Sequence, residues 1–314
     1  MMVRSNVMKE KEVLHLFIFL CWIVPLSASA YESELPRAMQ SSMPPPNLKA
    51  VSWVLMNPDT GVMIAAENPE EKMEPASLSK LLTAYIIFRE IRRGNLSQEE
   101  EVVISENAWR AGGSRMFIEP GERISVENLL LGMIVQSGND AAVALAEHVA
   151  GSEESFSGLL NQVAAELGLR NSHFVNSTGW PHPEHFSSAR DISLIASAII
   201  REFPEMYGYY SIREFTWNNI TQHNRNPLLG RDESIDGVKT GHTEEAGYCL
   251  VSSAKKDGMR LIAVVMGTDS EGARARESQK LLTYGFRFFE TYKAYSAGDI
   301  LDTAELWMGD KDQV

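Results

Sequence analysis

The chain has 314 residues, of which 44% are hydrophobic and 23% charged, and these proportions are ordinary for a soluble globular protein. That length can bury a large core, in one big domain or in one domain plus a smaller one. The formal net charge of -13 argues against a nucleic-acid partner, which needs a basic surface, and against polybasic attachment to anionic lipid.

The N-terminus has the features of a secretory signal. Basic residues precede an apolar run over 13–26, and Ala28-Ser29-Ala30 then offers a small-residue cleavage site. The run is short for a membrane span, although an uncleaved anchor or a plain N-terminal helix remains the alternative. We expect residues 1–30 to be a signal peptide cleaved near Ala30, and the mature protein to be exported to the periplasm or cell envelope.

Turn residues and hydrophobic periodicity then divide the chain into elements. The four prolines of residues 31–46 predict an exposed lead-in. Apolar β-favouring runs predict strands over 50–56, 62–66, 248–254 and 260–267, the last two joined by the hairpin turn Asp257-Gly258. Apolar residues at helical spacing predict helices over 78–93, 126–135, 141–150, 156–167, 191–203 and 278–292.

The order of these elements indicates the fold class. Strands come first and near the end, with helices between them, which predicts an α+β fold with an antiparallel sheet assembled from both ends of the chain and flanked by helices. Only two cysteines are present. Cys21 would leave with the signal, and the β-favouring neighbours of Cys249 favour a small buried apolar residue over a catalytic one.

Ser77 and Lys80 form the first candidate catalytic pair, in a Ser-x-x-Lys motif at the start of a predicted helix. Positions i and i+3 share a helix face, so the lysine can lie beside the serine hydroxyl and act as its base if burial lowers its pKa. Ser252 and Ser253 also have a lysine three residues later. Those serines lie at a hairpin end, where i and i+3 do not share a face, and the helix start therefore favours Ser77.

Two further motifs contain candidate site residues. Ser137-Gly138-Asn139 lies in a tight turn between two predicted helices, where its alternative interpretation is capping of the second helix by Asn139 or Asp140. Ser105-Glu106-Asn107 has the same form but no such turn. Lys239-Thr240-Gly241 precedes the strand that contains Tyr248, and its lysine and threonine suit a carboxylate, although a lone motif of this kind is more often an exposed turn.

These three motifs in this order are a known signature of β-lactamases and penicillin-binding proteins. The chain resembles the low-molecular-mass penicillin-binding proteins that act as D-alanyl-D-alanine carboxypeptidases, from about residue 50 to about residue 292. The resemblance rests on the segments Glu74-Pro75-Ala76-Ser77-Leu78-Ser79-Lys80, Gln136-Ser137-Gly138-Asn139-Asp140-Ala141, Ser188-Ala189-Arg190-Asp191, Gly237-Val238-Lys239-Thr240-Gly241-His242-Thr243 and Gly285-Phe286-Arg287-Phe288-Phe289.

The resemblance implies a role for each candidate site residue. Ser77 would be acylated by a stem peptide of peptidoglycan ending in D-Ala-D-Ala, and by β-lactams, with Lys80 as the base and Ser137 as a proton relay. The remaining roles fall to the substrate-binding residues. Asn139 would hold the substrate amide, Lys239 would supply positive charge, Thr240 would help bind the terminal carboxylate, and Gly241 would leave space for the substrate backbone. The N–H groups of Ser77 and His242 would bind the oxyanion, and Arg225 and Arg274 would be nearby cations.

The resemblance also implies a domain organisation. Residues 47–292 would form the catalytic peptidase domain, of the β-lactamase/transpeptidase-like fold, and residues 293–314 a truncated start of a C-terminal β-rich domain, with a strand over 304–307. Members of the family usually continue into a membrane anchor, and no such segment follows here, so we expect no firm membrane attachment.

Several alternatives stay open at this point. A class A-like β-lactamase would need a carboxylate for deacylation, for which Glu166 is the candidate, although a solvated helix glutamate fits its sequence context better. A DD-endopeptidase and a non-catalytic wall-binding or β-lactam-sensing module are the others. His182 and His185 suggest a metal, but Pro183 and the lack of a third ligand favour a polar surface loop, and we expect neither metal nor other cofactor.

Overall fold

The structure is a computed structural model that describes residues 43–296 and 298–302. The expected signal peptide, most of the lead-in and the strand expected over 304–307 lie outside these residues. In chain order the elements are β1 (Ser52–Asn57), β2 (Val62–Glu67), η1 (Ala76–Ser79), α1 (Lys80–Arg92), β3 (Glu101–Val103), α2 (Glu106–Arg110), β4 (Arg123–Ser125), α3 (Val126–Val135), α4 (Asn139–Ala150), α5 (Glu153–Glu166), α6 (Ala189–Glu202), α7 (Pro204–Tyr207), η2 (Gly208–Ser211), β5 (Glu214–Trp217), β6 (Ile220–His223), β7 (Ile235–Thr243), β8 (Gly247–Lys256), β9 (Met259–Thr268) and α8 (Glu271–Phe288).

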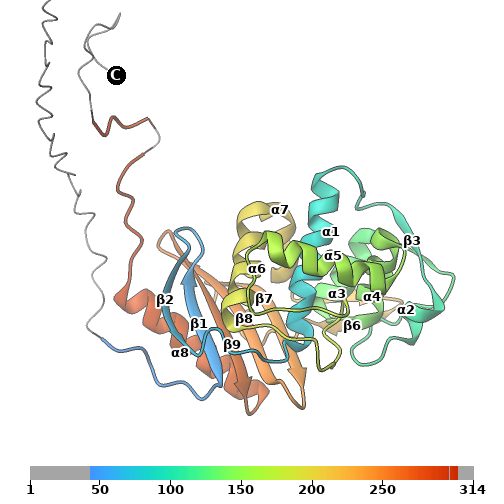
Figure 1. The fold of residues 1–314 in the computed structure, drawn as a ribbon, viewed down its shortest axis with the longest axis horizontal. Coiled ribbons are helices and arrows are strands. Elements are labelled where there is room, and N and C mark those ends of the chain that lie inside the picture. Colours follow the sequence, from blue (N-terminus) through green and yellow to red (C-terminus); the bar gives the residue numbers. More distant parts are fainter. Residues whose placement is uncertain (1–42, 297, 303–314) are drawn as a thin grey trace, which may run out of the picture. The chain divides into compact units, whose positions relative to one another are not determined.

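The main sheet has five strands in the order β2-β1-β9-β8-β7, and every neighbouring pair is antiparallel. The N-terminal hairpin therefore adds to the C-terminal strands through the pairing of β1 with β9, as the sequence predicts. Figure 1 shows this sheet together with α8 at one end of the described molecule, and helices α2 to α5 at the other. The α+β fold is thereby confirmed.

Strand periodicity divides the apolar side chains between two cores, one on each face of the sheet. Val54 and Val264 belong to the core that includes α1, α3, α4 and α6, whereas their neighbours Leu55 and Val265 belong to the core under α8. Because successive side chains of a strand point to opposite faces, a strand buried on both sides reads as a continuous apolar run. This explains why β1, β8 and β9 lack polar alternation.

Helix α8 differs most from its predicted bounds, because it begins at Glu271 instead of 278 and ends at Phe288 instead of 292. Ser270 caps it, with the hydroxyl oxygen accepting a hydrogen bond from Ala273 N at 3.1 Å. The first turns have few apolar residues and include Arg274 and Glu277, yet both side chains are buried. Arg274 donates to Gly241 O of β7, and Glu277 accepts from Lys49 N, so polar contacts that apolar periodicity cannot detect hold these turns in place.

Strand β7 was not predicted, and it contains the Lys239-Thr240-Gly241 motif, which was expected just before the strand that includes Tyr248. The segment mixes β-branched residues with Asp, Lys and two glycines, so local propensity gives only a weak strand signal. Its conformation follows instead from pairing with β8, in which Lys239 lies opposite Val251 and Gly241 opposite Cys249. Cys249 itself is buried, as predicted, and burial raises the pKa of its thiol to about 11.

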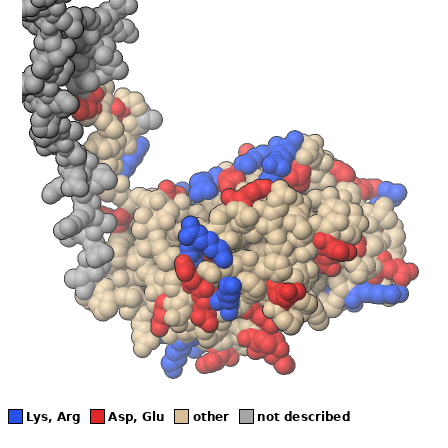
Figure 2. All heavy atoms as spheres, viewed as in Figure 1, with Lys and Arg blue, Asp and Glu red and all other residues tan. Residues whose placement is uncertain are grey.

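Within the described residues, no helix is long and apolar enough to cross a membrane. Figure 2 shows acidic and basic side chains interspersed over one face of the molecule. This face has no continuous basic surface of the kind that phosphate backbones require.

The packing of α8 on the sheet makes a stability prediction at Gly285. A Cβ atom added there would lie 2.4 Å from Leu261 Cδ1 and 3.0 Å from Leu55 Cδ2. We expect Gly285→Ala to lower the free energy of unfolding by about 1–3 kcal/mol through overpacking, despite the better helix propensity of alanine. Gly158→Ala in α5 is the matched control, because open space surrounds Gly158 and the change should stabilise by about 0.5–1 kcal/mol. Equal effects in denaturant melts would contradict this packing account.

Candidate active site

A cleft of about 550 Å³ opens between η1, the α3–α4 turn, the loop after α5 and the outer edge of β7. It gathers eight of the ten residues that the sequence analysis proposed for the site, although they come from distant parts of the chain. These eight are Ser77, Ser137, Asn139, Arg225, Thr240, Gly241, His242 and Arg274. The remaining two, Lys80 and Lys239, are buried behind the cleft wall.

Ser77 lies in the 3-10 turn η1, and Lys80 is the first residue of α1. Lys80 Nζ is 3.1 Å from Ser77 Oγ, 2.6 Å from Asn139 Oδ1 and 2.6 Å from the carbonyl oxygen of Thr178. The i, i+3 spacing therefore brings the two side chains together as predicted, with the serine one turn ahead of the α-helix proper. The amine is held by three separate segments of the chain.

The environment of Lys80 favours its neutral form. Its pKa is lowered to about 7, chiefly by burial and then by the positive charge of Arg225, which together outweigh the opposing influence of Asp140 and Glu153. A neutral amine has two N–H donors and one lone pair. Those two donors can serve Asn139 Oδ1 and the Thr178 carbonyl, which leaves the lone pair for the hydroxyl proton of Ser77.

The α3–α4 turn presents Ser137 and Asn139 to the cleft. Ser137 has a φ of 69°, and its buried hydroxyl has no hydrogen-bond partner among the described residues. Asn139 binds Lys80 through Oδ1 and donates from Nδ2 to Gly112 O at 2.6 Å. The alternative in which Asn139 or Asp140 caps the next helix is wrong for Asn139, because Gly138 is the N-cap of α4 and has no side chain to contribute.

Asp140 lies in the first turn of α4 and binds both the start of that helix and the segment between α2 and β4. Its buried carboxylate accepts hydrogen bonds from the backbone N–H groups of Met116 and Phe117 at 2.9–3.0 Å, as well as from Ala141 N. The segment before α3 is thus tied to the start of α4. Sequence reasoning did not identify this role, because it depends on a contact across 24 residues.

The β7 motif combines a buried cation with a close packing contact. Lys239 is 3% exposed, and burial, followed by the positive charges of Lys80, Arg225 and Arg274, holds its pKa well below the usual value. A Cβ atom added at Gly241 would lie 2.9 Å from Pro75 O, so the glycine lets η1 pack against β7.

The two arginines lie at the same end of the cleft as β7. Arg274 Nη1 donates to Gly241 O at 3.1 Å, and its guanidinium lies over the Tyr248 ring. Arg225 lines the cleft and is exposed. Together with Lys239 they concentrate positive charge where an anionic group can enter.

The loop over 174–187 also belongs to the site, and sequence reasoning missed it. Asn176 Oδ1 accepts hydrogen bonds from the backbone N–H groups of Thr178, Gly179 and Trp180, which folds the loop so that the Thr178 carbonyl reaches Lys80. Trp180 is 53% exposed at the cleft rim. Its only sequence signal is the turn-forming Asn176-Ser177-Thr178-Gly179.

His185, in the same loop, corrects the prediction of a polar surface loop. His182 is exposed, but His185 is only 2% exposed, and its Nε2 lies 2.7 Å from Ser79 Oγ. Its pKa is lowered to about 4, chiefly by burial and then by the charges of His173, His182 and Lys80. Within the described residues there is no cluster of three or more His, Cys, Asp or Glu side chains placed to hold a metal ion.

The serines outside the site have ordinary structural places. Ser105 caps α2, with its hydroxyl oxygen accepting a hydrogen bond from Ala108 N. Ser252 and Ser253 lie within strand β8, where residues three apart point to opposite faces. Of these serines, Ser77 is the one whose hydroxyl the structure places beside a lysine three residues later.

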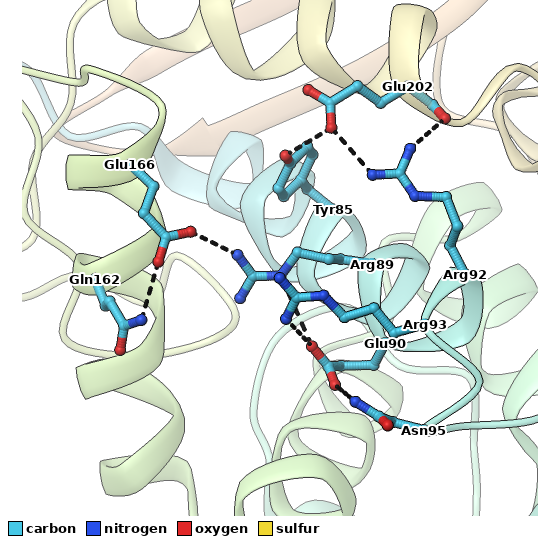
Figure 3. A network of polar contacts seen from close by, with 9 residues as sticks. All are labelled: Tyr85, Arg89, Glu90, Arg92, Arg93, Asn95, Gln162, Glu166 and Glu202. Carbon is cyan, nitrogen blue, oxygen red and sulfur yellow. Dashed lines mark hydrogen bonds and ion pairs between the residues drawn. The ribbon is translucent and has the colours of Figure 1, made fainter.

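Glu166 does not line the cleft. Figure 3 shows it in a separate polar network, where it accepts from Arg89 Nη1 at 2.7 Å and from Gln162 Nε2 at 2.9 Å. Arg89 is one of several cations and acids along the C-terminal half of α1. The solvated-helix interpretation of Glu166 agrees with this position, and the structure gives it no place in deacylation.

Comparison with known proteins places the chain in a family. The family model described as D-alanyl-D-alanine carboxypeptidase matches residues 38–270. The chain belongs to the D-alanyl-D-alanine carboxypeptidase family. It is a serine-type carboxypeptidase, so the family, fold and enzyme class that the sequence predicts are confirmed.

Particular relatives support the assignment. The chain is 43% identical to the D-alanyl-D-alanine carboxypeptidase DacC of Escherichia coli, over 88% of this chain and 71% of that protein. The crystal structure of penicillin binding protein 5 from Haemophilus influenzae is 42% identical, with a TM-score of 0.84 over 87% of this chain and 80% of that one. Penicillin-Binding Protein D2 from Listeria monocytogenes, solved in the ampicillin bound form, is 29% identical, with a TM-score of 0.70 over 77% of this chain and all of that one.

The position of Glu166 predicts that it has no part in turnover of a penicillin adduct. We expect Glu166→Gln to leave the rate of acyl-enzyme hydrolysis unchanged, because the carboxylate lies in the Arg89 network instead of the cleft. Loss of an ion pair whose glutamate is half exposed should lower the free energy of unfolding by at most about 1 kcal/mol. A large fall in the hydrolysis rate, measured by mass spectrometry of the adduct over time, would restore the β-lactamase alternative.

Proposed function

We propose that this enzyme removes the terminal D-alanine from peptidoglycan stem peptides that end in D-Ala-D-Ala, through an acyl-enzyme on Ser77. The observation that carries the proposal is the 3.1 Å contact between Ser77 Oγ and the buried Lys80 amine, in a chain of this family. Neutral Lys80 takes the hydroxyl proton as Oγ attacks the carbonyl carbon of the penultimate residue. Release of D-alanine then leaves an ester, which water hydrolyses.

Ser137 and Asn139 complete the acylation machinery in this proposal. The unpartnered Ser137 hydroxyl, buried in the cleft wall, is suited to pass a proton to the departing amine. Asn139 orients Lys80 through Oδ1 and is placed beside the path of the substrate amide. Both residues line the same cleft as Ser77, which is the geometry that a proton relay requires.

The cationic end of the cleft supports selectivity for a chain terminus. Burial, and then the positive charges of Lys80, Arg225 and Arg274, lower the pKa of Lys239, and a substrate carboxylate would offset those charges. Thr240 lines the cleft and offers a hydroxyl beside these charges. A peptide with its terminal carboxylate here therefore binds better than one whose chain continues, which favours a carboxypeptidase over a DD-endopeptidase.

Backbone groups supply the remaining contacts. The N–H groups of Ser77 and His242 would hold the oxyanion of the tetrahedral intermediate. Strand β7 is an edge strand whose outer side borders the cleft, so an extended peptide can add to the sheet there. The exposed His242 ring stacks on Tyr248, with 4.0 Å between ring centroids, which stiffens this end of β7.

A β-lactam would acylate Ser77 by the same route. Its strained amide takes the place of the D-Ala-D-Ala peptide bond, and its carboxylate takes the place of the terminal carboxylate. The ampicillin bound form of the Listeria monocytogenes relative supports this part of the proposal. We also propose export to the periplasm or cell envelope after cleavage near Ala30, in keeping with a substrate in the cell wall. No cofactor, metal or nucleic acid takes part in the proposed reaction.

Mass spectrometry of the acyl-enzyme tests this proposal. After incubation with penicillin, the adduct should lie on Ser77, and Ser77→Ala should abolish both the adduct and D-alanine release from a D-Ala-D-Ala peptide. Ser105→Ala is the control, because Ser105 also has an asparagine two residues later but lies outside the cleft. Penicillin should label the Ser105→Ala variant as it labels the wild-type enzyme. Labelling that survives Ser77→Ala would overturn the proposed mechanism.

A further inference from the structure

A chain of three hydrogen bonds runs from the loop after α5 to the peptide group in front of Ser77. Val175 N–H donates to His185 Nδ1 at 3.3 Å, Ser79 Oγ lies 2.7 Å from His185 Nε2, and Ser79 Oγ donates to Ala76 O at 2.9 Å. Since Nδ1 accepts from a backbone N–H, the proton of a neutral ring must lie on Nε2. The ring therefore donates to Ser79, and the serine hydroxyl proton is left for Ala76 O.

This chain is shielded from solvent, and the ring stays neutral. His185, Ser79 and Ala76 are each at most 2% exposed. The charged or titratable groups around the ring are His173, His182 and Lys80, and each of them disfavours the imidazolium form. Neither Ser79 nor His185 lines the cleft, so neither is placed to touch a substrate.

The peptide group that receives the chain has an unusual conformation. Ala76 has a φ of 48°, in the left-handed region that an alanine seldom adopts. Its carbonyl packs closely against Gly179. A Cβ atom added to Gly179 would lie only 1.7 Å from Ala76 O. The carbonyl thus lies against Gly179 while accepting the Ser79 hydroxyl, and these contacts fix the plane of the peptide.

The other end of the same peptide plane is the Ser77 N–H, a donor of the oxyanion hole in the proposed function. Because a peptide group is planar, fixing the direction of its carbonyl also fixes the direction of its N–H. A hydrogen bond to the carbonyl additionally polarises the peptide and strengthens the N–H as a donor.

We propose that His185 is a positioning residue that, through Ser79 and the Ala76 carbonyl, aims and polarises the Ser77 N–H toward the oxyanion. This inference rests on the proposed function, because it needs Ser77 to be the nucleophile. It requires no proton transfer through the chain, and His185 remains neutral throughout acylation. Its effect belongs to the transition state, in which negative charge develops on the substrate carbonyl oxygen.

Rapid-mixing kinetics of penicillin acylation on His185→Ala and Ser79→Ala test the inference. We expect the acylation rate constant to fall about tenfold, less than the 10²–10³ typical for loss of an oxyanion donor, because the Ser77 N–H itself remains. The dissociation constant of the initial complex should not change. The double variant should be no slower than either single one, because both substitutions interrupt one chain. His185→Gln should recover most of the rate, since its amide can donate to Ser79 and accept from Val175 N–H.

Two matched controls separate this effect from a general loss of packing. Ser193→Ala removes another buried hydroxyl that donates to a carbonyl three residues earlier, Arg190 O at 2.6 Å, but in α6. His182→Gln changes an exposed histidine of the same loop. Both should acylate at the wild-type rate.

Several results would overturn the inference. They are a wild-type acylation rate constant in folded His185→Ala or Ser79→Ala, an equal loss in Ser193→Ala, a change confined to the initial complex, or additive losses in the double variant. If His185→Ala does not fold, Ser79→Ala alone decides by the same criteria. In every such case penicillin still attaches to Ser77, whereas failure of the proposed function would show as labelling elsewhere.

Discussion

The site depends on one buried amino group, that of Lys80. Three acceptors surround its Nζ atom within 3.1 Å: the Ser77 hydroxyl, the Asn139 amide oxygen and the Thr178 carbonyl. They come from η1, α4 and the loop after α5, so one atom ties together the parts of the chain that form the cleft. Burial disfavours the charged form of the amine and so lowers its pKa. The lowered pKa lets this lysine act as a base for the serine.

Electrostatic repulsion within the cleft is the second constraint. Lys239 is buried with no carboxylate hydrogen-bonded to it among the described residues, and Lys80, Arg225 and Arg274 all act on it. A stable fold has no need for such an arrangement, since unpaired buried charge is costly. A substrate that ends in a carboxylate turns this cost into binding free energy. Arg225 also lowers the pKa of Lys80, second to burial, so substrate binding and the base strength of Lys80 are coupled through this shared charge.

The sequence predicted much of this structure because much of it is local. Apolar periodicity located β1, β8 and β9, and it located α3 with the bounds that the structure shows. The contact between Ser77 and Lys80 could be predicted because helix geometry alone brings i and i+3 together. Order along the chain then made the other two motifs informative.

The remainder could not be predicted, because it depends on contacts between distant segments. Strand β7 has little β propensity and forms through its partner β8. The Thr178 carbonyl is a backbone group, and nothing in residue identity marks it as a ligand of Lys80 across 98 positions. His185 looked like part of a polar surface loop, and only the fold shows that it lies buried against Ser79.

The most direct test of the central claim is an NMR titration of the Lys80 amine in the unliganded enzyme, with ¹³C-labelled lysine and Lys80→Arg for assignment. The account predicts a lysine resonance that titrates near pH 7, well below its neighbours on the surface. A Lys80 signal that stays in the protonated position up to pH 10 would contradict the account, because the amine would then have no lone pair for the Ser77 proton.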